Sequence, residues 1–244
     1  MRSSRPRDIG FAIASCAVLA AYNNVIHRHP WHHRRYTALN ACATGAALSA
    51  AMASGLTAAD LGVGREEWAP GRLGAGLAAA VAAGWLLVAA VPVTRPVLDD
   101  RRITSLDGRA IAYQALVRIP VGTVLWEEAA FRGVLQAALR RVVPGTAAIA
   151  VTSGVFGIWH IRPTIQALRV NGLAGNRAQA AARVAGSVAV TTAGGVLLSW
   201  LRERSGRLAA PVLLHLAVNS GGLVAAWAAG SAVPASRAVR EPAA

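Results

Sequence analysis

The sequence contains no lysine and little charge of either sign. Only 15% of its 244 residues are charged, and Asp and Glu together number 11. Soluble domains carry about 25% charged residues, so this chain has too few charged groups to cover a surface that faces water. Since a membrane-spanning helix needs roughly 20 apolar residues, the length allows at most about eight spans. These limits exclude a large soluble domain beside a full membrane bundle.

Cysteine is also scarce, with only Cys16 and Cys42 in the whole chain. Both lie in apolar segments, and no Cys-x-x-Cys spacing occurs. This excludes a disulfide framework, and we expect both thiols to pack as small hydrophobic side chains.

The formal net charge of +14 comes entirely from arginine. The arginines are spread over the ends of the apolar segments and form no single patch, so the charge favours contact with anionic lipid headgroups over nucleic acid. They divide almost evenly between the two sets of loops. The positive-inside rule therefore does not fix the orientation in the membrane.

Long apolar, alanine-rich runs dominate the rest of the sequence. Hydropathy predicts spans near 9–26, 38–57, 73–93, 111–139, 146–168, 184–201 and 208–230. The fold class predicted is all-α, a polytopic transmembrane helix bundle of seven to eight spans in the cell membrane. The run 111–139 fits one long helix or two, and the far end of 146–168 is open because Arg162 and Pro163 follow the apolar part.

Two acidic residues, Glu127 and Glu128, lie inside an apolar run, whereas the others fall in predicted loops or tails. An ionisable residue at the centre of a membrane helix costs about 2.5 to 3.5 kcal/mol, so these residues and Arg132 need a partner or a function. Glu128 and Arg132 are four residues apart, which predicts an ion pair on one helix face. Glu127 is turned about 100° away and stays outside that pair.

Two histidines also lie in apolar runs. His160 shares a helix face with Phe156, and His215 shares one with Asn219. At 1.5 Å per residue, Glu127, His160, His215 and Asn219 lie about 18, 21, 11 and 17 Å from one side of the membrane. These depths predict that they meet around one cavity, with groups suited to activating water.

Three strings carry a resemblance to a known family: EEAAFRG at 127–133, FGIWH at 156–160 and HLAVN at 215–219. They are similar to the EExxxR, FxxxH and HxxxN/D motifs of the CPBP (CAAX protease and bacteriocin-processing, or Abi) intramembrane proteases, which include the type II CAAX prenyl endopeptidases. The motifs occur in the family's order on three separate apolar segments.

The resemblance implies a role for each matching position. Glu127 would be the general base that takes a proton from water, and His160 would help to hold that water. Glu128 would pair with Arg132 and fix the helix. His215 and Asn219 would stabilise the oxyanion of the tetrahedral intermediate or, in the metalloprotease description of the family, help to hold a divalent ion.

A metal site is permitted by the sequence without being required. A catalytic zinc ion usually takes three protein ligands, a count that Glu127, His160 and His215 would satisfy. The local spacing HExxH is missing. The histidine-rich segment 26–36 also contains several arginines, which oppose cation binding, so we expect it to lie in the headgroup layer.

The sequence therefore predicts three parts: N-terminal transmembrane helices at 1–110, a catalytic helical core at 111–230 and a disordered tail at 231–244. The leading hypothesis is an intramembrane endopeptidase whose partners are membrane lipid and a peptide or protein substrate. In one form of this hypothesis, the substrate is itself anchored in the membrane. An immunity or binding protein of the same fold, without catalysis, is the alternative. A proton-coupled transporter is disfavoured because no inverted repeat is evident.

Overall fold

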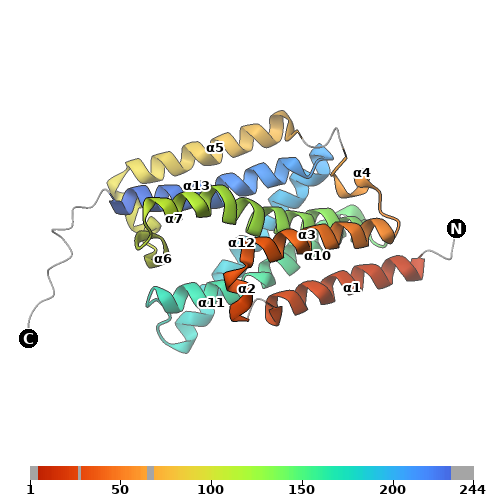
Figure 1. The fold of residues 1–244 in the computed structure, drawn as a ribbon, viewed down its shortest axis with the longest axis horizontal. Coiled ribbons are helices and arrows are strands. Elements are labelled where there is room, and N and C mark those ends of the chain that lie inside the picture. The colour runs from red at the N-terminus through yellow and green to blue at the C-terminus, as the bar shows by residue number, and fades with distance from the viewer. Residues whose placement is uncertain (1–4, 27–28, 65–68, 232–244) are drawn as a thin grey trace, which may run out of the picture.

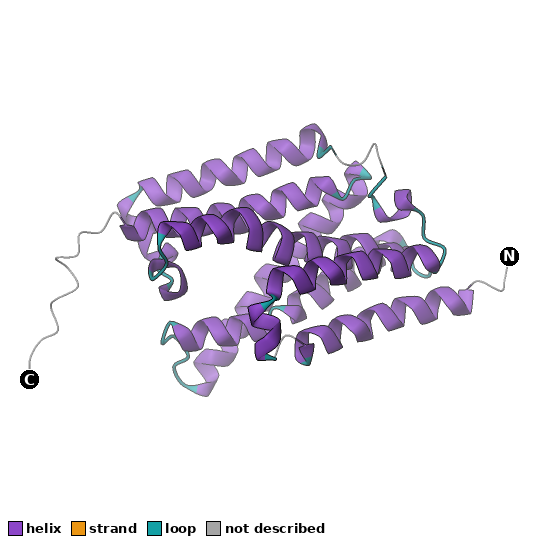
Figure 2. Cartoon of the chain, in the orientation of Figure 1, coloured by secondary structure: helices purple, strands orange, loops and turns teal. Residues whose placement is uncertain are grey.

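The computed structural model describes residues 5–26, 29–64 and 69–231, and this part of the chain contains helices and loops but no strand (Figure 2). The all-helical class predicted from the sequence is therefore confirmed. The tail predicted at 231–244 lies outside the described residues except for Ser231.

The N-terminal half consists of separate helices joined by short connections. They are α1 (Arg5–Asn24), α2 (Pro30–Arg34), α3 (Tyr36–Ala53), α4 (Ala58–Leu61) and α5 (Gly71–Ala90), followed by the 3₁₀ segment η3 (Pro92–Leu98) and α6 (Arg101–Thr104). Helix α4 begins with a capping box in which Thr57 and Asp60 each accept a hydrogen bond from the other's backbone N–H.

The next element is one helix that runs without a break from Gly108 to Arg140, which decides between the one-helix and two-helix predictions for 111–139. Its pieces are α7 (Gly108–Tyr113), η4 (Gln114–Leu125), α8 (Trp126–Glu128), η5 (Ala129–Leu135) and α9 (Gln136–Arg140). The segments η4 and η5 are π-helical. They lie on either side of the two glutamates. In proteins, π-helical turns often occur at functional sites.

The C-terminal part contains α10 (Gly145–Trp159), α11 (Ile161–Val170), α12 (Arg177–Ser205) and α13 (Ala209–Ser231). The predicted span 146–168 is wrong as a single helix, because the chain breaks at His160. Pro163 has no N–H to donate to the carbonyl of Trp159. That carbonyl accepts a hydrogen bond from Asn23 Nδ2 instead, at 3.0 Å.

Three of the described helices are long and apolar enough to cross a membrane: Gly71–Ala90, Arg177–Ser205 and Ala209–Gly230. The predicted count of seven to eight spans is therefore not confirmed. Helix α10 shows one reason, because its 15 residues are fewer than the roughly 20 that a crossing needs.

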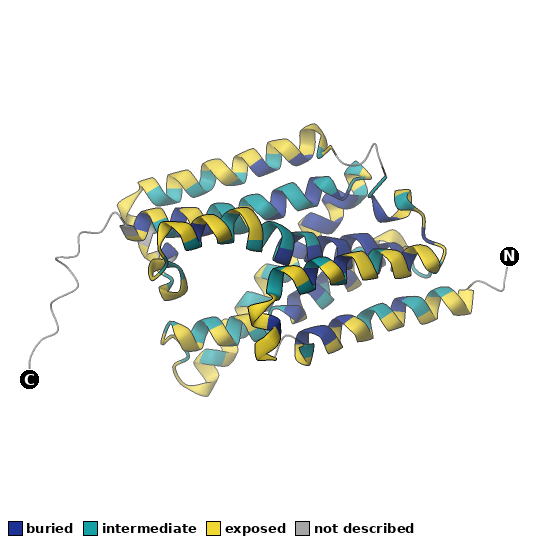
Figure 3. Cartoon of the chain, viewed as in Figure 1, coloured by how far each residue is buried: buried dark blue, intermediate teal, exposed yellow. Residues whose placement is uncertain are grey.

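The long helices run side by side along the longest axis of the molecule (Figure 1). Buried residues gather where these helices face one another, while the outer sides of α1 and α5 are exposed (Figure 3). Large apolar side chains are exposed on the outside of the bundle, among them Leu86 of α5 and Leu116 of η4, which are 73% and 75% exposed. Polar groups such as Glu128 and Arg132 are instead fully buried. This inverted distribution suits a surface covered by hydrocarbon.

Helices α5 and α13 approach closely because small residues lie between them. A Cβ atom added at Gly74 of α5 would lie 2.9 Å from Cβ and 3.0 Å from Cα of Ala210 at the start of α13. Gly221 of α13 is similarly close to the ring of Trp85.

Gly74→Ala is expected to destabilise the protein by about 1–3 kcal/mol, because the backbone of Ala210 cannot move away without separating the two helices. Gly76→Ala is the matched control, since nothing lies within 4 Å of an added Cβ there. The unfolding midpoint in detergent micelles measures both. An equal midpoint for the two variants would contradict the close packing of α5 on α13.

Candidate active site

Glu127 lies in α8 with a nearly buried side chain, 9% exposed. Its Oε1 accepts a hydrogen bond from Trp159 Nε1 at 3.2 Å. Its Oε2 is buried and has no hydrogen-bond partner among the described residues, although His215 Nε2 is 3.9 Å away. Glu127 therefore presents one fixed oxygen and one oxygen that is free to accept a proton.

The Glu128–Arg132 ion pair predicted from the spacing is present. Arg132 Nη1 donates to Glu128 Oε1 at 2.9 Å, and both side chains are 0% exposed. The guanidinium also packs over the ring of Phe156, with Cζ 4.0 Å from the ring centroid. An ion pair so deeply buried needs further polar partners to offset desolvation.

His215 supplies such a partner from another helix. Its Nδ1 lies 2.7 Å from Glu128 Oε1, and its Nε2 lies 3.1 Å from Asn219 Nδ2. Because a carboxylate accepts and an amide nitrogen donates, this arrangement assigns the ring proton to Nδ1 and a lone pair to Nε2. Glu128 thus joins α8 to α13 and fixes the His215 ring beside Glu127.

His160 lies at the break between α10 and α11 and is half-buried. Its Nδ1 donates to the carbonyl oxygen of Phe156 at 2.7 Å, which leaves Nε2 as the free nitrogen. The rings of His160 and His215 both contact Phe156, at centroid distances of 4.6 and 6.1 Å. The structure thus brings His160 to the same aromatic side chain as His215, but no hydrogen bond joins it to Glu127 among the described residues.

The proposed metal ligands Glu127, His160 and His215 do not form a suitable donor set in this arrangement. Nowhere in the described ranges do three His, Cys, Asp or Glu side chains gather closely enough to hold a metal ion. The two ring nitrogens of His215 are engaged by Glu128 and Asn219. These residues therefore do not fit the tetrahedral zinc site that their number permits.

The sequence interpretation missed one residue of the site, Trp159, and also a polar cluster outside the site, where Gln136 and Arg140 of the long helix meet Glu203 of α12. Trp159 binds Glu127, although its position next to His160 carried no signal beyond an aromatic in an apolar run. Gln136, two turns beyond Glu128, donates to Glu203 Oε1 at 2.8 Å, and Arg140 lies 2.6 Å from Glu203 Oε2. The spacing of four residues along one helix was the signal that could have identified Gln136.

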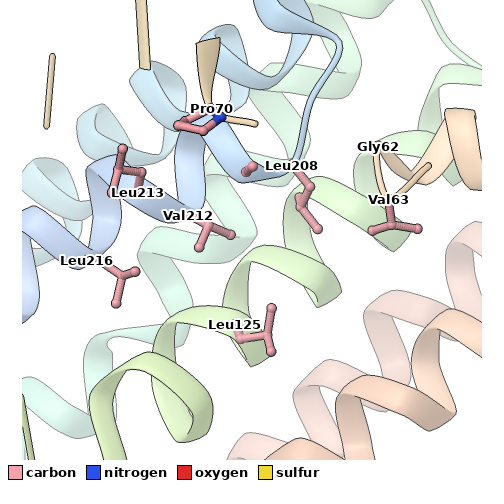
Figure 4. Close-up of a pocket in the computed structure, with 9 residues that line it drawn as sticks. Gly62, Val63, Pro70, Leu125, Leu208, Val212, Leu213 and Leu216 are labelled. Atoms are coloured by element: carbon pink, nitrogen blue, oxygen red, sulfur yellow. The ribbon is translucent and has the colours of Figure 1, made fainter. Parts of the chain in front are cut away.

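An apolar cavity of about 230 Å³ lies between the segment after α4, the long helix and the first part of α13. Its wall is made of aliphatic side chains and small residues: Gly62, Val63, Pro70, Leu125, Leu208, Ala209, Val212, Leu213 and Leu216 (Figure 4). Leu125 is two residues before Glu127, and Leu216 follows His215. The cavity therefore borders the two elements that carry the acidic and basic groups.

Comparison with known proteins gives one family. Residues 110–221 match the family model described as type II CAAX prenyl endopeptidase Rce1-like. This match confirms the family that the three motifs predicted, and it covers the segment from the start of the long helix to α13. The family is one of proteases, which supports a hydrolase acting on a peptide or protein. No curated protein and no solved structure matches the chain.

Arg132→Met is expected to destabilise the protein by about 3–5 kcal/mol, because it leaves the Glu128 carboxylate buried without its cation. The double variant Glu128→Gln, Arg132→Met removes both charges and is expected to lose less stability than Arg132→Met alone. Unfolding in detergent with increasing denaturant measures the difference. A double variant less stable than the single one would show that the pair itself is not the main interaction.

Proposed function

With residues 110–221 matched to the type II CAAX prenyl endopeptidase family, we propose that the chain is an intramembrane endopeptidase that hydrolyses a peptide bond with a water activated by Glu127. The observation that carries the proposal is the Glu127 carboxylate. Trp159 fixes one of its oxygens, and the other is buried, has no hydrogen-bond partner among the described residues and lies 3.9 Å from an imidazole nitrogen. We further propose that the chain crosses the cell membrane several times.

The reaction begins with Glu127 Oε2 as general base. It removes a proton from water while the water oxygen forms a bond to the peptide carbonyl carbon, and the carbonyl π electrons move to oxygen. His160 Nε2, the free nitrogen of that ring, helps to orient the water. The proton then passes from Glu127 to the peptide nitrogen as the C–N bond breaks. This yields a carboxyl group and an amine and returns Glu127 to its starting form.

Asn219 supplies a donor for the oxyanion. Its amide nitrogen carries two N–H bonds, of which one is used by His215 Nε2 at 3.1 Å. The second makes no hydrogen bond to any residue in the described ranges and is available to the oxygen on which negative charge develops. A donor fixed before the reaction stabilises that charge strongly in a site that excludes water.

Glu128 and Arg132 position these groups without touching the substrate. Glu128 holds the His215 ring through Nδ1, and Arg132 holds Glu128. Because His215 in turn binds Asn219, the ion pair sets the position of the proposed oxyanion donor.

The apolar cavity supports a substrate that carries an apolar chain near the scissile bond. Its wall contains Leu125 and Leu216, which are close in sequence to Glu127 and His215. A hydrocarbon chain in this cavity would lie against the long helix and α13, the two elements that carry Glu127 and His215, as we propose for a prenylated substrate of the kind for which the family is named. A non-catalytic binding protein has no use for a free buried carboxylate, and the intact set of Glu127, His160, His215 and Asn219 favours the enzyme.

Glu127→Gln is expected to lower kcat by about 10²–10⁴-fold, because an amide cannot accept the proton. Its unfolding midpoint should change little, since the Gln oxygen still accepts from Trp159. Cleavage of a panel of prenylated and unprenylated peptides by the purified protein measures the effect. Glu203→Gln is the matched control, as that carboxylate pairs with Arg140 at the surface. Equal activity of wild type and Glu127→Gln would remove the general-base role.

Treatment with a chelator is expected to leave kcat within about twofold of the untreated value, because the described histidines and glutamates do not form a three-ligand set. Elemental analysis of the same sample gives the metal content. A loss of activity that returns on addition of zinc would contradict this prediction and restore His215 and Glu127 as candidate ligands.

A further inference from the structure

A second and larger cavity, of about 690 Å³, lies between the α2–α3 corner and the first half of the long helix. Its lining residues come from two stretches of chain that are far apart in sequence, around 33–41 and 110–118. None of them belongs to the three motifs, and none takes part in the proposed reaction.

The wall of this cavity is strongly basic. Arg34, Arg35 and Arg118 line it together with His33, and no acidic residue of the described ranges does. Arg118 is half-buried in the long helix, and its guanidinium lies 4.6 Å from the ring centroid of Tyr36. It makes no ion pair and no hydrogen bond within the described ranges. A guanidinium partly removed from water in this way favours an anionic ligand, because its planar fork matches the oxygens of a phosphate or carboxylate.

Apolar side chains adjoin the basic wall on the outer side of the same helix. Tyr113 is 52% exposed, Leu116 is 75% exposed and Val117 is 40% exposed, all within about one turn of Arg118. Trp31 of α2, two residues before the lining residue His33, is 48% exposed in a segment whose composition suits the headgroup layer. A basic site beside an exposed apolar helix face is complementary to a molecule with an anionic head and hydrocarbon tails.

We propose that this cavity binds the phosphate of one anionic phospholipid, with the acyl chains lying along Leu116 and Val117. The phosphate oxygens accept hydrogen bonds from Arg118 and from Arg34 or Arg35. Basic pockets between membrane helices bind the headgroups of acidic lipids in this way.

The bound lipid would also support the active site. Arg118 packs on the ring of Tyr36, and the Tyr36 hydroxyl oxygen lies 3.0 Å from Thr123 Oγ1. Thr123 is four residues before Glu127 on the same helix. Fixing Arg118 therefore fixes the side of the helix from which Glu127 projects.

The test uses the full chain in detergent with phosphatidylglycerol or phosphatidylcholine added at equal concentration. We expect phosphatidylglycerol to be retained at one molecule per chain in native mass spectrometry and to raise the unfolding midpoint by about 5 °C, with phosphatidylcholine doing neither. Arg118→Gln should weaken retention at least tenfold. Arg169→Gln, an exposed arginine of α11 away from the cavity, is the matched control and should bind as wild type does.

The double variant Arg34→Gln, Arg35→Gln covers the case in which Arg118→Gln does not fold, since both side chains are exposed at the rim. It should also lose retention. Equal retention of the two lipids, or unchanged retention in both cavity variants, would overturn the proposal. So would a full midpoint shift with water-soluble glycerol phosphate, which would indicate a free phosphate ester. Displacement of phosphatidylglycerol by a peptide with a free C-terminal carboxylate, but not by its amide, would assign the cavity to substrate.

Discussion

The arrangement of the site depends on one buried ion pair. Glu128 and Arg132 are fully enclosed, and Glu128 also accepts a hydrogen bond from His215 of a different helix. The carboxylate is therefore shared between a cation on its own helix and a ring on α13. Adjacent residues of a helix point about 100° apart, so once Glu128 faces this pair, Glu127 must project toward Trp159. The direction of the proposed base follows from the position of its neighbour.

Contacts within one helix could be predicted from the sequence, and contacts between helices could not. The spacing of four residues predicted the Glu128–Arg132 pair, and it placed His215 and Asn219 on one face. It carried no information on which helix faces which. The hydrogen bond from His215 to Glu128 depends on how α13 is rotated against the long helix. Packing between helices sets that rotation, for example the close contact of Gly74 in α5 with Ala210 in α13.

The same limit explains the differences in the helices themselves. Hydropathy identified most of the apolar runs, but an average over a window does not register one missing donor. Pro163 ends the regular bonding of α10, and Asn23 takes the carbonyl that becomes available. The break places His160 at a corner instead of inside a span. Its Nδ1 then bonds to the Phe156 carbonyl, which decides the nitrogen it presents.

The long helix shows how this chain places some of its few charged residues. Glu128, Arg132, Gln136 and Arg140 repeat every four residues, and their exposure rises from fully buried at Glu128 to 52% for the Arg140 side chain. Each polar side chain of this row has a polar partner, and Glu203 of α12 joins the last two. Between Ala129 and Leu139, all other residues of the helix are apolar or glycine. One row of paired polar groups thus lets a helix carry charge through an apolar protein. Glu127, one residue off the row, keeps an oxygen without a hydrogen-bond partner in the part of the chain that the structure describes.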